Sequence, residues 1–449
     1  MPGKRHYGKE TRKALSNFSS GFIGRDLIRA YGEVKKSCLY AIQEYENAFG
    51  DDVFQCIKNA ADEVISGSLD YDFPLPLEQG GAGTSINMNM NEVISSRAME
   101  LFFKRSGKKI KIDPITDINR YQSTNDTFPT AVTVMLYRHL CEIESLVIKL
   151  QEILINEEIR NGGILMAGRT EMQDALPLTL GQVFASWAGP IERDRWRLNK
   201  LKERIRLIAL GGTALGTCFS APRNYIFLAE KYLREFTGLP LSRSQNLTDE
   251  ISNQDKWSEL ASGYAVFSQN IFKMTGDLLI YTSSIAGEIR HPELQYGSTI
   301  MAAKTNPVIL EYSRGLSIAV ESDAGRIMEY SKNGQLQLNP FLPFIAESFI
   351  EIYKRINKIV SSLLDNFFPL MSIEYSRIEE NLVRSNVLLN TLLPVIGYYG
   401  VKELYHAIEN TSPQSMEEYK SLIKTFTHLS TEEIDRLFDP LNSSSPGKN

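Results

Sequence analysis

Apolar residues recur at intervals of three and four over long stretches of this chain, and strand-like alternation is scarce. The longest run is Trp257, Leu260, Tyr264, Phe267, Ile271, Met274, Leu278, Tyr281 and Ile285. This spacing places all of these side chains on one face of a helix of the coiled-coil type. Because no proline occurs between Pro240 and Pro292, the pattern predicts one very long helix in this region.

Four further segments have helical periodicity. One runs from about Pro129 to Arg160 and stops at Asn161-Gly162-Gly163, which is typical of a helix end. The others cover about 178–210, about 307–332 and about 341–364. Long helices joined by short connections predict a central bundle, and with it a mainly α fold.

The arrangement along the chain predicts three helical domains. Residues 1–128 have shorter helical patterns and more loops, residues 129–367 form the long-helix bundle, and residues 368–449 form a small C-terminal domain. The apolar stripes exceed what one copy of the bundle can cover, which indicates self-association.

Composition and charge narrow the class of protein. The 449 residues are 43% hydrophobic and 23% charged, with a net charge of −5, which fits a soluble protein with a large core and excludes a basic nucleic-acid footprint. No window approaches the roughly 18 apolar residues that a membrane span needs. The four cysteines are widely scattered without metal-ligand spacing, so we expect a cytoplasmic protein with no metal site.

The most informative candidate site is the segment 297–307 (GSTIMAAKTNP), which lies between two long helical patterns. Its small residues suit a loop that closes over a ligand, and its hydroxyls and Lys304 suit proton transfer or anion binding. The alternative is an ordinary polar turn before a helix that starts at Pro307.

Four other segments add to this signal: residues 83–92 (GTSINMNMNE), 122–130 (QSTNDTFPT), 168–175 (GRTEMQDA) and 211–217 (GGTALGT). Together with 297–307 they resemble the aspartase/fumarase superfamily, in detail the branch that contains aspartate ammonia-lyase and the class II fumarases. The resemblance spans nearly the whole chain. It is highly specific for the superfamily and less so for the substrate.

The resemblance implies a reversible β-elimination of ammonia or an amine from an aspartate-like substrate, giving fumarate or a fumarate-like product. It implies no cofactor. The partners it implies are a small dicarboxylate or amino-acid substrate and three further copies of the chain, in a homotetramer whose subunits share each active site. Neither nucleic acid nor a membrane is an expected partner.

The resemblance also assigns roles to residues. Ser298 is the base, activated by surrounding N–H donors and by Lys304, and Glu171 and Glu311 complete the catalytic set. The residues implied to bind the substrate are Thr84, Ser85, Asn89, Ser123, Thr124, Asn125, Thr170, Thr299 and Asn306.

Several of these residues have a structural alternative. Asn89, Asn91 and Asn125 suit helix caps and turns, which is the commonest use of asparagine. For Asp126 and Thr130 we favour a role at a helix start. The segment 211–217 lacks the features of a phosphate loop, so we expect a tight loop that shapes the floor of the site. His6 lies in a polar start that we expect to be mobile.

The main departure from the family pattern is Glu171, which stands where the family has histidine. The family's His–Glu pair then becomes Glu171 facing Glu311, and two close carboxylates do not both ionise cheaply. Alternatively, Glu171 turns into a salt bridge with an arginine, Arg290 being a candidate. This departure leaves three other functions open: a fumarate hydratase, a specialised lyase with an altered substrate, and a catalytically silent homologue.

Overall fold

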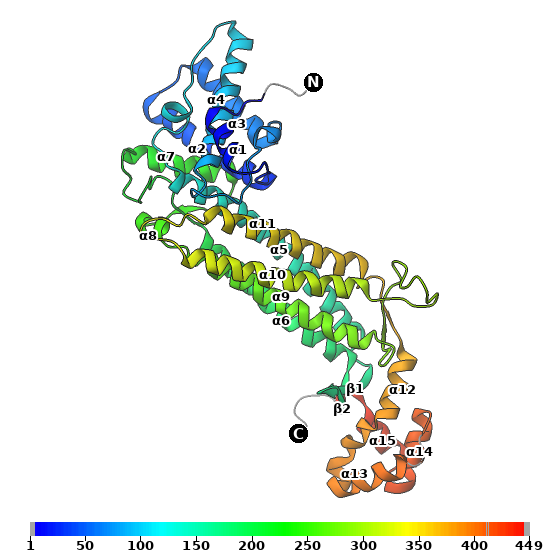
Figure 1. The fold of residues 1–449 in the computed structure, drawn as a ribbon. Coiled ribbons are helices and arrows are strands. Elements are labelled where there is room, and N and C mark those ends of the chain that lie inside the picture. Colours follow the sequence, from blue (N-terminus) through cyan, green and yellow to red (C-terminus); the bar gives the residue numbers. More distant parts are fainter. Residues whose placement is uncertain (1–4, 410, 412, 444–449) are drawn as a thin grey trace. The chain divides into compact units, whose positions relative to one another are not determined.

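The computed structural model describes residues 5–409, 411 and 413–443 of the chain, and these fold into helices with a few short strands (Figure 1). The predicted mainly α fold is confirmed. The five long helices are α5 (Thr124–Arg160), α6 (Leu180–Ile205), α9 (Asp255–Tyr281), α10 (Val308–Lys332) and α11 (Leu342–Asn366). None of the helices in the described part of the chain has the length and apolar character needed to cross a membrane.

The periodicity of the sequence placed these helices closely. The predicted segment around Trp257 is α9, and its seam is buried at every position from Trp257 to Leu278. Ile285 is the exception, since it lies beyond the end of α9 and is 86% exposed. The segment predicted to stop at Asn161 is α5, which ends at Arg160.

The chain divides into two compact units, and each long helix contributes residues to both. The first unit consists of residues 1–144, 196–266 and 319–356, and the second of residues 145–195, 267–318 and 357–449. The division into three domains stays a prediction.

The first unit also contains shorter helices. They are α1 (Lys9–Asn17), α2 (Arg25–Glu46), α3 (Asp51–Ser66), α4 (Thr84–Ser106), α7 (Arg223–Thr237) and α8 (Leu247–Ser252), with short turns at Asp70–Asp72 and Pro114–Ile118 and the two-residue strands β3 (Leu207–Ile208) and β4 (Ser242–Arg243). Helix α2 packs between α3 and α7 and is buried along most of its length. Where the long helices enter this unit, Trp257 and Tyr264 of α9 pack edge-on against Phe349 of α11.

His6 is buried in this unit, so the expectation that it lies in a mobile start is wrong. Its Nδ1 lies 2.8 Å from Asp72 Oδ2, and its Nε2 lies 2.7 Å from Glu100 Oε2. Hydrogen bonds from Lys104 and His6 lower the pKa of Glu100 to about 2. The sequence gives no local sign of this cluster because its acidic partners lie 66 and 94 residues away along the chain.

The second unit holds the other ends of the long helices and the C-terminal elements. The C-terminal elements are α12 (Tyr375–Ser385), a turn at Val387–Leu392, α13 (Leu393–Glu409), α14 (Met416–Thr427), α15 (Thr431–Phe438) and α16 (Pro440–Ser443). The strands of this unit are β1 (Leu165–Thr170), β2 (Gln173–Thr179), β5 (Ile289–Arg290) and β6 (Ser372–Ile373). Strands β1 and β2 pair antiparallel as a hairpin, and β5 pairs antiparallel with β6. The apolar residues of α12 to α15 form one core, to which Ala167 of β1 belongs.

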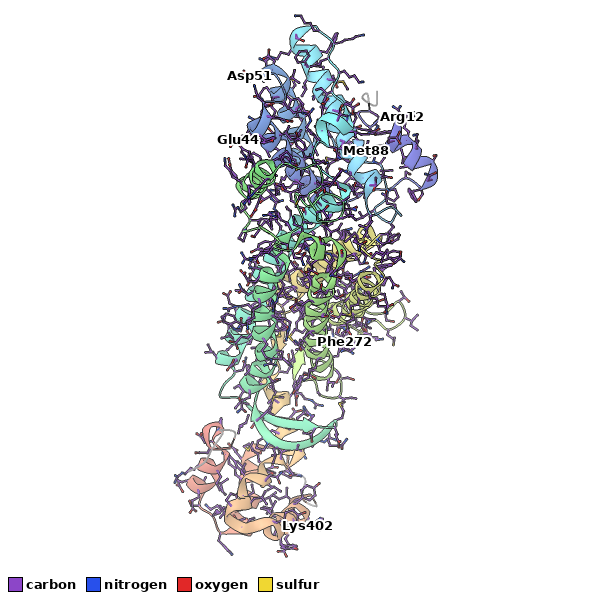
Figure 2. All side chains as sticks on the ribbon, turned by 90° about the vertical axis from the view of Figure 1, so that its left-hand side faces the viewer. Arg12, Glu44, Asp51, Met88, Phe272 and Lys402 are labelled. Carbon is purple, nitrogen blue, oxygen red and sulfur yellow. The ribbon has the colours of Figure 1, made fainter. Side chains whose placement is uncertain are left out.

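Within the second unit, polar contacts fix the long helices against one another. The indole of Trp187 on α6 donates to Asp277 on α9 at 2.8 Å. Arg314 of α10 donates to the backbone carbonyl of Phe272 on α9 at 2.7 Å. Its guanidinium carbon lies 3.7 Å from the centre of the Phe272 ring. Phe272 is labelled in Figure 2. Partly buried hydrogen bonds that cross between helices in this way fix the alignment of α10, which begins directly after the segment 297–307.

Candidate active site

The segment 297–307 is a loop between α9 and α10 whose two ends are held together. Asn306 donates its side-chain amide to the carbonyl of Gly297 at 2.8 Å. A Cβ added at Gly297 would lie 2.0 Å from the carbonyl oxygen of Lys304, so only glycine fits this crossing of the backbone. The loop therefore has a closed neck and a free outer part, which is more than an ordinary polar turn before Pro307.

Ser298 stands at the start of this loop, and its hydroxyl oxygen accepts two backbone hydrogen bonds. Ile300 N lies 3.2 Å from the Oγ, and Met301 N lies 3.0 Å from it. Amide N–H groups aimed at one oxygen favour negative charge on it, because each brings the positive end of a fixed dipole. The side chain is half-buried, so a ligand can still reach it. The resemblance implies N–H donors around a serine base, and Ser298 has two; its role as the base stays a prediction.

Lys304 and Thr299 lie in the same loop and are exposed. No carboxylate in the described part of the chain pairs with Lys304. The loop borders a cavity of about 1050 Å³ in the second unit, where Lys304 and Thr305 are among the lining residues together with Arg290, His291 and Arg377. Glu293 and Glu374 also line this cavity, and Arg290 and Arg377 are paired with Glu374 and Glu380, so among the described residues Lys304 is the lining cation available to an anion.

Thr170 and Glu171 lie at the tip of the β1–β2 hairpin. Thr170 pairs with Gln173, so Glu171 and Met172 alone form the turn. Both have positive φ, +52° and +66°, the backbone of a tight type I′ hairpin that asparagine and glycine usually occupy. The side chains of Thr170 and Glu171 are exposed. The sequence does not predict this hairpin, because neither turn residue signals it.

A buried ion pair anchors the hairpin. Arg169 binds the carboxylate of Glu288 with two hydrogen bonds of 2.9 and 2.8 Å, and Asn381 of α12 donates to the same carboxylate at 2.8 Å. The Glu288 side chain is completely buried, whereas that of Arg169 is 21% exposed. Hydrogen bonding to Glu288 raises the pKa of Arg169 above its usual value. Sequence reasoning gave no role to Glu288 or Asn381, which lie far from Arg169 along the chain.

Glu171 and Glu311 do not meet in the structure of the single chain. Glu311 lies in the first turn of α10 and is exposed, and the two carboxylates share no hydrogen bond in the described residues. The arginines are engaged elsewhere, Arg169 with Glu288 and Arg290 with Glu374 at 3.2 Å. Within the described residues no arginine forms an ion pair with Glu171, so the alternative in which it pairs with an arginine of its own chain is not seen there. The Glu171–Glu311 pairing stays a prediction for an assembly of several chains.

The remaining candidate residues lie in the first unit, at the starts of two helices. Thr84 opens α4 and donates its hydroxyl to the carbonyl of Gly81 at 2.8 Å, with Ser85 beside it half-buried. Asn89 is buried, and its amide donates to the carbonyl of Asp72 at 2.9 Å. This contact agrees with the structural alternative for Asn89. In Figure 2 the label of Met88, the residue before Asn89, shows where α4 lies.

Ser123, Thr124 and Asn125 open α5. The Ser123 Oγ accepts from Asn125 N at 3.2 Å, and the Thr124 hydroxyl accepts from the amide of Asn87 at 2.9 Å. Asn125 is half-buried and donates to the carbonyl of Ala214 at 2.9 Å, so it touches the segment 211–217. That segment is a tight loop between β3 and α7, as the sequence predicted. The Asp126 carboxylate accepts from Ser123 N at 3.0 Å, which confirms its expected place at a helix start.

Comparison with known proteins shows the family of the whole chain. Residues 6–321 match the family described as lyase. The chain is 33% identical to an aspartate ammonia-lyase of Bacillus sp, over 100% of this chain and 96% of the relative. It is 31% identical to a class II fumarate hydratase of Thermus aquaticus, over 100% and 97%. Its fold matches the "fumarate lyase:delta crystallin" of Brucella melitensis with a TM-score of 0.90 and 28% identity, covering 99% and 97% of the two chains.

The family match and these relatives show that the chain is a lyase. The chain belongs to the aspartase/fumarase superfamily.

Proposed function

We propose that this protein removes ammonia from L-aspartate or a closely similar amino acid, with fumarate or a fumarate-like compound as product. The observation that carries the proposal is the Ser298 hydroxyl, which accepts two backbone N–H groups at the start of the loop. The 33% identity to an aspartate ammonia-lyase over the whole chain supports ammonia as the leaving group.

In the proposed reaction, Ser298 in its alkoxide form takes a proton from the carbon beside one substrate carboxylate. The electron pair left behind moves toward that carboxylate, and the resulting dianion is held by aimed donors and by Lys304. The amine then leaves from the neighbouring carbon as the double bond forms. Each group acts on charge that grows during the reaction, which is the requirement for accelerating it.

The proposal includes a homotetramer that shares its sites between subunits. Apolar side chains remain exposed on the long helices, among them Ile159 at 74% and Ile318 at 59%. Burial of these side chains against a neighbouring copy of the chain would remove them from water, which supports the proposed assembly. In the assembly, Thr84, Thr170 and the Ser123–Asn125 segment bind the two carboxylates and the leaving group around Ser298.

Replacing Glu171 with histidine is expected to lower the KM for L-aspartate about three- to tenfold at pH 7. The change removes a negative charge from the hairpin tip and supplies a donor for a substrate carboxylate, and one charge at an exposed position is worth about 1 kcal/mol. Steady-state kinetics of Glu171→His measure this, with Met172→His as the control that leaves KM unchanged. A higher KM for Glu171→His would show that this chain uses the carboxylate.

The proposal is tested in the reverse direction. Purified protein is incubated with fumarate and ammonium chloride, with fumarate and methylamine, and with fumarate alone, and the vinyl proton signal is followed by NMR. The proposed function predicts loss of that signal with formation of aspartate only when ammonium is present. Malate in all three samples would instead identify a fumarate hydratase. N-methylaspartate formed faster than aspartate would identify a specialised amine lyase.

A further inference from the structure

One buried carboxylate ties two of the family segments together. Asp126 is completely buried, and its Oδ1 accepts from Ser123 N at 3.0 Å. Its Oδ2 accepts from Gly211 N at 3.2 Å and from Thr213 N at 2.9 Å. The same side chain therefore fixes the start of α5 and the start of the 211–217 loop. Asn125, which lies next to it, spans the same gap by donating to Ala214.

A buried lysine organises the other side of this region. Lys35 of α2 is completely buried and donates to Asn119 Oδ1 at 2.9 Å and to Gln122 Oε1 at 2.8 Å. The Asn119 oxygen also accepts from Asn87 at 3.1 Å and from Asn91 at 3.2 Å, both on α4. Asn87 in turn donates to Thr124. The network thus links α2, α4 and the residues that open α5.

Charge in this network is costly to maintain, which argues for a role beyond packing. Burial raises the pKa of Asp126 to about 7 and lowers that of Lys35 to about 7, while their mutual attraction opposes both shifts. Apolar residues of similar volume often stabilise an interior as well as a buried ionic pair does. Buried charged groups such as Asp126 and Lys35 therefore point to a role in setting a particular arrangement of the chain.

We propose that Asp126 is a positioning residue, which sets the Ser123–Asn125 segment against the 211–217 loop in the geometry that binds the substrate carboxylates. Asp126 touches no substrate. It acts through three backbone N–H groups, while the Lys35 network holds Asn119 and Gln122 before the segment and reaches Thr124 within it through Asn87. This inference rests on the proposed function, because it takes Ser123, Thr124 and Asn125 as the substrate-binding residues.

Asp126→Asn tests the inference. An amide cannot accept from both sides, so either Ser123 N or the pair Gly211 N and Thr213 N meets an NH₂ group and moves away. A displacement of about 1 Å is enough to change binding or rate by up to about 100-fold. We expect the KM to rise about tenfold or more while kcat changes less than about threefold, measured with whichever of L-aspartate or L-malate the wild type converts.

The matched control is Glu33→Gln, the same chemical change at another buried carboxylate of this unit. Both Glu33 oxygens bind Arg138, at 2.7 and 3.0 Å, and Glu33 lies outside the network. We expect Glu33→Gln to lower the melting temperature but to keep the wild-type KM. If Asp126→Asn does not fold, Gln122→Met takes its place, since it removes one acceptor of Lys35 at a half-buried position.

The outcomes separate this inference from the proposed function. A raised KM in the network variant with a normal KM in Glu33→Gln supports positioning. A wild-type KM in the network variant overturns it and leaves Asp126 a structural residue. Equal changes of kcat and KM in the network variant and in Glu33→Gln overturn it as well. A wild type that converts neither L-aspartate nor L-malate contradicts the proposed function for L-aspartate itself, and the inference as tested here falls with it.

Discussion

Replacing Ser298 with alanine is expected to lower kcat by about 1,000-fold or more and to leave the fold unchanged. The variant keeps the loop neck, because Asn306 still donates to the Gly297 carbonyl. It loses the one oxygen on which the N–H groups of Ile300 and Met301 converge. Removing a general base costs roughly 100- to 10,000-fold, and no other hydroxyl in this loop has two backbone donors.

The measurement is steady-state turnover of the variant and the wild type, with circular dichroism to confirm folding. Ser262→Ala is the matched control, because Ser262 is exposed on α9 and its hydroxyl donates only to the Ser258 carbonyl of the same helix. We expect wild-type kcat for the control. Full activity of Ser298→Ala would show that another group takes the proton, and would remove the observation on which the proposed function depends.

The second large effect is expected on stability, from Arg169→Met. In the variant, Asn381 is the one side-chain partner left to Glu288 among the described residues. The completely buried Glu288 carboxylate then has no positive charge opposite it. Removing one member of a buried ion pair costs about 3–5 kcal/mol. Because Arg169 precedes Thr170 and Glu171, the hairpin tip loses its anchor as well. We expect lower turnover together with a clearly lower unfolding midpoint.

The matched control is Arg290→Met, the same change at an ion pair with Glu374 in which the arginine is 72% exposed. Exposed pairs contribute about 0–1 kcal/mol, so its midpoint should stay near that of the wild type. Urea unfolding of both variants distinguishes the cases. Arg169→Met combined with Glu288→Leu should recover much of the loss, since no charge is then left buried. Equal midpoints for the two arginine variants would contradict the assigned anchor.

The long helices were predictable because their information is local. Intervals of three and four around Trp257 identified α9, and the stop at Asn161 located the end of α5, whereas α5 begins at Thr124, ahead of the predicted start at about Pro129. The β1–β2 hairpin was not predictable in the same way. Its turn uses Glu171 and Met172 at positive φ, where glycine or asparagine would have signalled a hairpin, and tertiary contacts of Arg169 stabilise it instead.

Candidate site residues could be proposed from the sequence, but the residues that hold them in place could not. The loop around Ser298 and the segment at Asn125 could be found from short motifs, whose spacing is fixed along the chain. Glu288 and Lys35 could not, because each meets its partners at separations of 84 to 119 residues. Partners at such distances come together only in the folded chain, so residue type alone gives no sign of them.

The central claim is that this lyase acts on a carbon–nitrogen bond. The most direct test mixes the purified wild-type protein with L-aspartate, and in parallel with L-malate, and follows fumarate by its ultraviolet absorbance. Rapid formation of fumarate from L-aspartate, with none from L-malate, is the predicted result. Fumarate from L-malate and none from L-aspartate would contradict the claim and make the protein a fumarate hydratase.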